Sequence, residues 1–203
     1  MNSSEIENGI SHIYKNDKYL AKIIEKSEPC SISPKRNYYD MLLRSIIQQQ
    51  LSIYSAAAIH RKFIAHYKNK PIPENIIKTP NNTLRNLGLS NAKAKYVKDL
   101  SEKVLAGEIK FTGLGKKSDE EIIEHLIKVK GIGVWTVHMF LIFTLGRLNV
   151  LPVGDLGLRR AIMNGYGLRK LPDDRKISKI SKENGWNPYN SIASWYLWKS
   201  LEL

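Results

Sequence analysis

The chain has 203 residues, of which 42% are hydrophobic and 25% are charged, as in folded globular proteins rather than disordered ones. Its formal net charge of +13 predicts a polyanionic partner, with nucleic acid favoured and an anionic membrane surface as the alternative. The single cysteine, Cys30, excludes an internal disulfide, a cysteine-ligated zinc site and a four-cysteine iron–sulfur cluster. The five histidines show no metal-ligand spacing, so we expect no metal bound by side chains.

The N-terminal stretch, MNSSEIENGISHIYKND, carries acidic residues and has neither an apolar core nor a small-residue cleavage site, so we expect no signal peptide. The longest apolar run, from Val134 to Gly146, has 13 residues. A membrane span needs ~20. We therefore expect a protein that is neither secreted nor membrane-bound, located in the cytoplasm at the nucleoid of a bacterium or archaeon, or in a eukaryotic nucleus.

Apolar residues recur at three- and four-residue spacing along nearly the whole chain, and convincing period-two runs are absent, which predicts an all-α fold. We expect, after an N-terminal helix, helices over about 18–26, 38–50, 53–67, 91–106 and 119–129, a very apolar helix after residue 133, and helices over about 174–183 and 189–201. The Pro-rich connection at 69–83 is expected to hold one or two short helices.

These helices are expected to form two lobes with a DNA-binding cleft between them, in one unit spanning residues 1–203. The first lobe would cover about 35–115. The second would combine 1–34 with 116–203, because we expect the N-terminal residues to return beside the C-terminal helices.

Residues 125–172 contain seven Lys or Arg residues and one carboxylate, Asp155. Within this stretch, Lys130-Gly131-Ile132-Gly133 predicts a tight turn that needs positive φ, which glycine adopts without a Cβ clash. The helix that follows would offer unpaired backbone N–H groups to a phosphate, with Lys130 adding attraction to the DNA backbone. On spacing alone, an ordinary corner between two core helices explains the two glycines equally well.

The run IKVKGIGVWTVHMF followed by LPVGDLGLRRAI resembles the helix–hairpin–helix DNA glycosylase superfamily, and within it the short 3-methyladenine DNA glycosylase II branch. Three further segments resemble the family's signatures, in order along the chain: RSIIQQQLSIYSAA, GLSNAKAKYVKDLSEKV and WNPYNSIASWYLWKSL. Two positions depart from the pattern. Gln48 replaces a small residue, and Asn190 stands where the family has Arg, which puts efficiency and lesion range in doubt.

The resemblance implies that Asp155 is the catalytic carboxylate. Without the resemblance, a helix N-cap is the favoured interpretation of Asp155, and the residue can do both. Trp135 stands where the lyase branches place their nucleophilic Lys, so no Schiff base can form there. Trp135 and Tyr189 are then expected to line the base pocket, although Tyr189 fits a core aromatic equally well.

For DNA binding, the resemblance implies the hairpin residues Lys130, Gly131, Ile132 and Gly133 together with Gln49, Gln50, Ser52 and Lys93. Gln50 falls at the position where relatives insert a side chain into the gap left by the flipped base, with Gln49 as the rival. Relatives also hold a monovalent cation on hairpin carbonyls, which corresponds here to a structural Na⁺ or K⁺ on those of Ile127, Val129 and Ile132.

The resulting hypothesis is a monomeric, monofunctional DNA glycosylase without an organic cofactor. It would flip out and hydrolyse alkylated purines, chiefly 3-methyladenine and also 7-methylguanine, from double-stranded DNA and leave an abasic site. Two alternatives stay open: a glycosylase of the same superfamily for another lesion class, and a non-catalytic DNA-binding module with the same hairpin.

Overall fold

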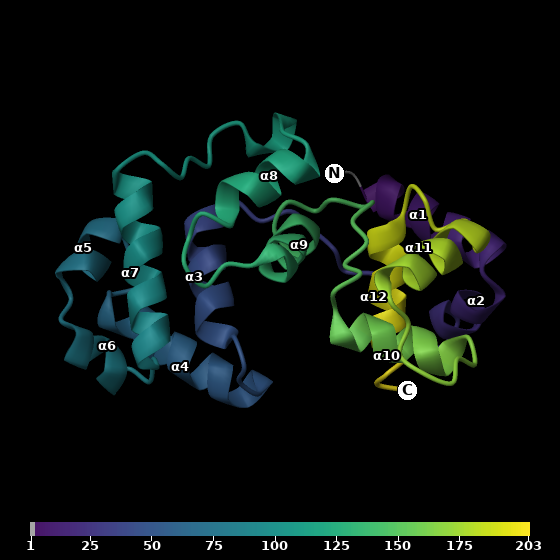
Figure 1. Cartoon of the computed structure of the whole chain (residues 1–203), viewed down its shortest axis with the longest axis horizontal. Coiled ribbons are helices and arrows are strands. Elements are labelled where there is room, and N and C mark those ends of the chain that lie inside the picture. Colours follow the sequence, from purple (N-terminus) through teal and green to yellow (C-terminus); the bar gives the residue numbers. More distant parts are fainter. Residues whose placement is uncertain (1–2) are drawn as a thin grey trace. The chain divides into compact units, whose positions relative to one another are not determined.

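The computed structural model describes residues 3–203, and within that range the secondary structure is entirely helical, without a strand (Figure 1). The predicted all-α fold is confirmed. In chain order the elements are α1 (Ser3–Asn16), α2 (Lys18–Ile24), α3 (Tyr38–Gln48), α4 (Ile53–His66), α5 (Pro73–Lys78), α6 (Asn81–Asn86), α7 (Asn91–Leu105), the 3₁₀ helix η1 (Leu114–Lys116), α8 (Asp119–Leu126), α9 (Val134–Phe143), α10 (Leu156–Gly165), α11 (Asp174–Glu183) and α12 (Asn190–Lys199). Across this described range, no helix is both long and apolar enough to span a bilayer.

Side-chain caps fix where several helices begin. The hydroxyls of Ser52 and Ser90 accept the third backbone N–H of α4 and α7, and Asp173 does the same for α11. Ser118 and Glu121 form a reciprocal capping box at the start of α8. Because such caps satisfy N–H groups that have no partner within the helix, they are readable in the sequence, and these four predicted starts are confirmed.

The chain folds into two compact units, which are described separately. Arg36–Val137 forms one, called here the hairpin unit, and the chain on either side of it forms the other, called the Asp155 unit. The boundary therefore lies inside α9, whereas the sequence suggested a boundary near residue 115. The reason is that the hairpin bonds to earlier helices: the Lys130 N–H donates to Asp99 of α7, and Gln49 beyond α3 donates to the Gly131 carbonyl.

In the hairpin unit, α7 packs against α3, α5 and α6, and α3 also packs against α4 (Figure 1). Apolar side chains at helical spacing supply the contact, with four fully buried on α3 and two on α7: Leu42, Leu43, Ile46, Ile47, Val97 and Leu100. Burying a stripe of this kind is what holds an amphipathic helix in place.

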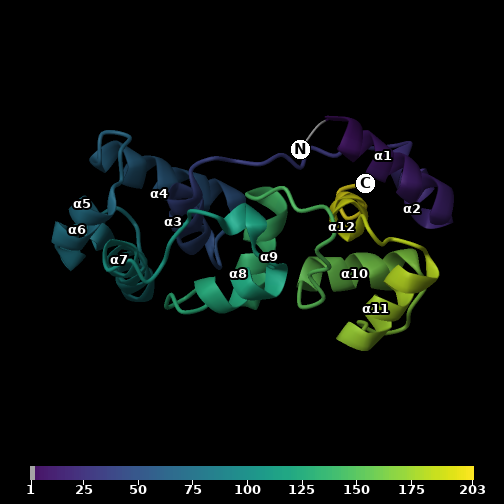
Figure 2. The same cartoon turned by 90° about the horizontal axis from the view of Figure 1, so that it is seen from above.

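In the Asp155 unit, α12 packs against α1, α2 and α10, so the N-terminal helices lie beside the C-terminal one (Figure 2). Every residue from Asn190 to Leu197 is buried, so this part of α12 is enclosed on all sides rather than along one stripe.

A buried carboxylate joins the two ends of the chain within the Asp155 unit. Asp17, only 1% exposed, caps α2 by accepting the backbone N–H groups of Tyr19 and Leu20, both at 2.9 Å, on Oδ1. Its Oδ2 accepts the Tyr166 hydroxyl at 2.5 Å and the Trp186 Nε1–H at 2.7 Å. Four donors thus satisfy both oxygens of this buried side chain. Even a neutral polar group costs about 2–7 kcal/mol when it is buried without a partner.

The position where the family has Arg is filled by a neutral network. Asn190 is buried, its Oδ1 accepts the Ser181 hydroxyl at 2.6 Å, and its Nδ2 donates to Asn149 Oδ1 at 2.7 Å. Asn149 in turn donates to Asn187 Oδ1 at 2.8 Å. The departure from the family pattern therefore leaves no unsatisfied amide on Asn190, because Ser181 and Asn149 complete its hydrogen bonds.

Candidate functional site

The predicted catalytic carboxylate is held by two donors to one oxygen. Asp155 caps α10, and its Oδ1 accepts the Leu158 backbone N–H at 2.6 Å and the Trp198 Nε1–H at 2.8 Å. The two donors come from different helices, α10 and α12, so together they fix the orientation of the carboxylate. Capping and a chemical role are thus compatible at this residue, as the sequence suggested.

Neighbouring residues fix the surroundings of Asp155. The Trp198 ring lies against Phe143 of α9, with centroids 5.7 Å apart. Gly157 leaves space there, since a Cβ at that residue would come within 3.1 Å of Asp155 Oδ1. Arg159 anchors the loop before Asp155 by donating from Nε to the Val153 carbonyl at 2.9 Å, and its Nη2 pairs with Asp174 at 2.5 Å.

Trp198 lies at the candidate site, although sequence reasoning did not single it out. The helical spacing of the aromatic residues in α12 gave no reason to separate Trp198 from its neighbours. The structure separates them: Trp195 and Tyr196 are buried, whereas Trp198 is half-buried and donates to Asp155. The only usable signal was the indole N–H, which needs a partner when it leaves solvent.

The turn between α8 and α9 has the geometry predicted for the hairpin. Gly131 has φ +83°, and a Cβ there would come within 2.2 Å of the Tyr96 ring, so only glycine fits. Ile132 is buried, which anchors the turn, while Gly133 is exposed at the start of α9. The first N–H groups of α9 have no carbonyl partner within the helix and can bind a phosphate.

The hairpin is fastened to α7. Asp99 accepts the Lys130 N–H on Oδ2 at 2.9 Å, and its Oδ1 lies 3.6 Å from Lys130 Nζ. The Lys130 side chain is nonetheless 74% exposed, so its ammonium group remains available to a phosphate. Sequence reasoning did not find Asp99, which is almost fully buried and lies 31 residues earlier.

The two glutamines after α3 have different surroundings. Gln49 Nε2 donates to the Gly131 carbonyl at 2.7 Å, so this side chain is engaged in holding the hairpin. Gln50 is exposed and has φ +55°, a left-handed conformation that L-residues adopt at a cost. Ser52 is exposed and accepts the Ser55 N–H at 3.2 Å as the cap of α4.

Lys93 was expected to contact DNA, but its ammonium group donates to protein carbonyls. Lys93 Nζ lies 2.8 Å from the Ile47 carbonyl and 2.6 Å from the Gln49 carbonyl. Partial burial lowers the pKa of the Lys93 ammonium group. The side chain therefore caps the C-terminal end of α3.

The two predicted base-pocket aromatics are found in different units. Trp135, in the hairpin unit, is 47% exposed in the first turn of α9. Tyr189, in the Asp155 unit, is half-buried, and its ring lies 5.2 Å from that of His12 and closes over Gly9 on α1. These contacts favour the alternative reading of Tyr189 as a packing residue between α1 and α12.

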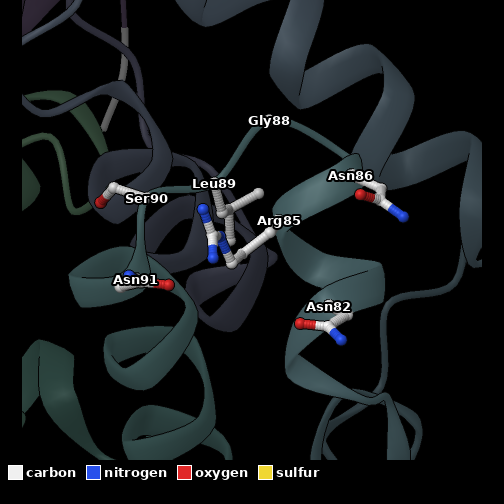
Figure 3. Close-up of a pocket in the computed structure, with 7 residues that line it drawn as sticks. All are labelled: Asn82, Arg85, Asn86, Gly88, Leu89, Ser90 and Asn91. Atoms are coloured by element: carbon white, nitrogen blue, oxygen red, sulfur yellow. The ribbon is translucent and has the colours of Figure 1, made fainter.

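An open pocket of about 740 Å³ lies at the turn between α6 and α7, and none of the predicted site residues lines it. Figure 3 shows the Arg85 side chain extending across this turn toward Ser90 and Asn91. Asn82 and Asn86 contribute amide groups. The lining contains no carboxylate, so the pocket lacks the group that glycosidic hydrolysis requires.

Comparison with known proteins gives consistent results. A family model described as "HhH-GPD superfamily base excision DNA repair protein" matches residues 43–187. The chain is 31% identical to the alkylbase DNA glycosidase-like protein mag2 of Schizosaccharomyces pombe, over 98% of this chain and 96% of the relative. It is 34% identical to the putative DNA-3-methyladenine glycosylase YfjP of Bacillus subtilis, over 97% and 71%. The structure resembles that of Schizosaccharomyces pombe 3-methyladenine DNA glycosylase (Mag1) in complex with abasic DNA, with a TM-score of 0.84, 33% identity and 97% coverage of both chains.

Proposed function

Because the chain belongs to the HhH-GPD superfamily of base excision DNA repair proteins, we propose that it is a monofunctional DNA glycosylase that removes alkylated purines, chiefly 3-methyladenine and also 7-methylguanine. Relatives similar over most of the chain are named as enzymes acting on 3-methyladenine, and one was solved bound to abasic DNA. The proposed partner is double-stranded DNA containing such lesions, bound by a monomer. The proposed place of action is wherever the cell keeps its DNA.

The observation that carries the proposal is the arrangement around Asp155. This carboxylate is held by Leu158 N–H and Trp198 Nε1–H, in a stretch of 48 residues (125–172) that contains no other acid. A fixed anion next to a cationic sugar is what glycosidic hydrolysis needs, because the transition state resembles an oxocarbenium ion.

The chemistry follows from the charge on the lesion. Alkylation at N3 or N7 makes the purine cationic, so the base leaves with the electron pair of the glycosidic bond without first being protonated. Asp155 stabilises the positive sugar, a water oxygen bonds to C1′, and Asp155 accepts the proton that this water releases. The products are the free base and an abasic site.

Trp135 supports a reaction without strand cleavage. Lyase relatives use a Lys at this position to form a Schiff base with the sugar, and an indole cannot form one. The half-exposed ring instead offers a π-face to an alkylated base, and attraction between a cation and an indole contributes about 0.5–2 kcal/mol. Such a contact would favour cationic bases without reading their hydrogen-bond pattern.

Gln50 is the better candidate for the residue that fills the gap left by the flipped nucleotide. Gln49 donates to the Gly131 carbonyl and would have to break that bond to enter DNA. Gln50 is exposed in a left-handed conformation at the end of α3. A side chain inserted between base steps stabilises the extruded state of the neighbouring nucleotide.

We propose that the hairpin carbonyls bind a monovalent cation, Na⁺ or K⁺. The Val129 carbonyl accepts the Ile132 N–H at 3.1 Å, which leaves one lone pair for an ion. Together with the carbonyls of Ile127 and Ile132, it would hold the cation beside the N-terminus of α9. A bound cation would supply positive charge for a DNA phosphate and take no part in glycosidic cleavage.

The proposal is tested by incubating the protein with methylated DNA and identifying the released bases by chromatography. We expect free 3-methyladenine from the wild type, and a loss of about 100-fold or more in single-turnover rate for Asp155→Asn. Asp173→Asn is the matched control, since Asp173 also caps a helix and Asn caps equally well. A loss common to both variants would assign Asp155 to capping alone.

Other outcomes decide between the remaining hypotheses. Release of deaminated or oxidised bases from a panel of lesion duplexes, without release of methylated purines, would assign the protein to another lesion class. Binding to DNA without release of any base would make it a non-catalytic module. A covalent adduct trapped by borohydride would contradict the monofunctional assignment.

A further inference from the structure

The turn that carries Gln50 is held in a costly conformation. Gln50 lies two residues after the end of α3 at Gln48 and has φ +55°, a left-handed conformation that crowds the Cβ of any residue other than glycine. Such a conformation persists only where the surroundings determine it. The contacts that fix this turn therefore decide whether Gln50 stays exposed at the end of α3.

Lys93 supplies two of those contacts. Its ammonium group reaches from the first turn of α7 to the Ile47 carbonyl, inside α3, and to the Gln49 carbonyl, directly before Gln50. The Lys93 backbone is itself fixed, because its N–H donates to the Ser90 cap at 3.2 Å. A cation at the C-terminal end of a helix also opposes the negative end of the helix dipole.

The same turn is linked to the hairpin. Gln49 donates from its side chain to the Gly131 carbonyl, while its own carbonyl accepts from Lys93. The hairpin returns to α7 through the Lys130 N–H and Asp99. These hydrogen bonds link Lys93 of α7 to the end of α3, the end of α3 to the hairpin, and the hairpin back to α7.

We propose that Lys93 is a positioning residue for base flipping: it fixes the Gln50 turn relative to the phosphate-binding hairpin instead of binding a DNA phosphate itself. Two of its three ammonium hydrogens are committed to the Ile47 and Gln49 carbonyls. Without them the left-handed turn relaxes, and the Gln50 side chain loses its fixed distance from the bound DNA backbone. The inference rests on the proposed function insofar as it takes Gln50 as the inserted side chain.

The salt dependence of binding separates positioning from phosphate contact. Each phosphate neutralised by a lysine adds about 0.9 to the slope of log K against log salt concentration on B-DNA. We expect Lys93→Met to keep the wild-type slope on a duplex with an abasic-site analogue. With an alkylated duplex at saturating enzyme, we expect its single-turnover excision to fall at least tenfold, and the fluorescence of a 2-aminopurine beside the lesion to rise less than with the wild type.

Lys95→Met is the matched control, because Lys95 is exposed on the same helix and the substitution removes the same charge. We expect its excision at saturating enzyme to equal that of the wild type. If Lys93→Met fails to fold, Lys93→Gln, which can donate to one of the two carbonyls, is measured in its place. A slope lower by about 0.9 with unchanged excision would show that Lys93 contacts a phosphate and would overturn the proposal.

A double-mutant cycle with Gln50→Gly tests whether Lys93 acts through the turn. Glycine adopts the left-handed conformation without cost and has no side chain to insert, so adding Lys93→Met to it should lower flipping no further. If the two substitutions instead lower flipping independently, so that their effects multiply in the double variant, Lys93 does not act through the Gln50 turn. The slopes and the cycle measured by 2-aminopurine fluorescence do not require base release, so they decide the role of Lys93 even if the wild type excises no alkylated purine.

Discussion

The indole N–H of Trp198 donates to Asp155 Oδ1 at 2.8 Å, and the two residues lie 43 positions apart in the chain. The same oxygen caps α10 through the Leu158 N–H at 2.6 Å. A carboxylate fixed by two donors of different origin, one from its own helix and one from α12, keeps a constant orientation. Electrostatic stabilisation of a transition state depends on such preorganisation, so we expect the contact to affect the rate of excision.

Trp198→Phe tests this contact directly. The substitution keeps an aromatic ring against Phe143 and removes the donor to Asp155. Because a hydrogen bond to a charged group contributes about 1.5–3 kcal/mol, we expect single-turnover excision to fall about 10- to 100-fold. The affinity for an abasic-site duplex should change less than twofold. Trp195→Phe makes the same chemical change on the same helix and should leave the rate unaltered, and equal rates for both variants would refute the assignment.

Gln49 and Gln50 should be separable by their effects on binding and excision. Gln49→Glu places a carboxylate oxygen against the Gly131 carbonyl in place of the amide donor, so we expect weaker binding even to undamaged duplex. Gln50→Ala should bind undamaged duplex like the wild type and excise more slowly. Binding is measured by fluorescence anisotropy, and excision is measured as the single-turnover rate of base release. The reverse pattern would make Gln49 the inserted residue.

Tyr54 is the most exposed of the large hydrophobic side chains described, at 89%, and stands in the first turn of α4 beside the Gln50 turn. An aromatic ring left in solvent beside a turn proposed to enter DNA is suited to stacking on a base. We expect Tyr54→Ala to weaken binding of an abasic-site duplex by about 1–3 kcal/mol, with an unchanged salt slope, and Tyr54→Phe to bind as the wild type does. Equal affinity of Tyr54→Ala and the wild type would remove Tyr54 from the interface.

Asp17→Asn should destabilise the Asp155 unit strongly. Oδ1 and Oδ2 each accept two N–H or O–H donors, so an amide must turn its own NH₂ toward donors in either orientation. We expect a loss of about 2–3 kcal/mol in the free energy of unfolding, measured with urea. Asp173→Asn, at an exposed cap, should be nearly neutral. Similar urea midpoints for the two variants would mean that the buried Asp17 carboxylate contributes little to the free energy of unfolding.

The hydrogen bond between Tyr166 and Asp17 also predicts that the protein loses stability at alkaline pH. Burial, and next the nearby Asp17 carboxylate, raise the pKa of the Tyr166 phenol above its ordinary value of 10.0. Folding therefore favours the protonated phenol, and this stabilisation is complete below pH 10 and declines as the pH rises beyond it. Tyr166→Phe should be less stable than the wild type at pH 7, and the difference should shrink above pH 10. A difference that is constant with pH would contradict this explanation.

The sequence determined the elements of this protein and the identity of its chemical groups. Helix positions were predictable because periodicity and caps act over a few residues, as at Ser90 and Ser118. Gly131 could be placed at a left-handed turn for the same local reason, and it has φ +83°. Asp155 stood out as the single acid of a basic stretch.

Only the tertiary structure decided what these groups contact. Trp198 and Asp155, Lys93 and Gln49, and Gln49 and Gly131 are 43, 44 and 82 positions apart, respectively. Each partner lies on another helix or turn, so its choice depends on how α3, α7, α10 and α12 pack within their units. Sequence reasoning therefore expected Lys93 at the DNA and did not single out Trp198, since no periodicity records which carbonyl or carboxylate a long side chain will reach.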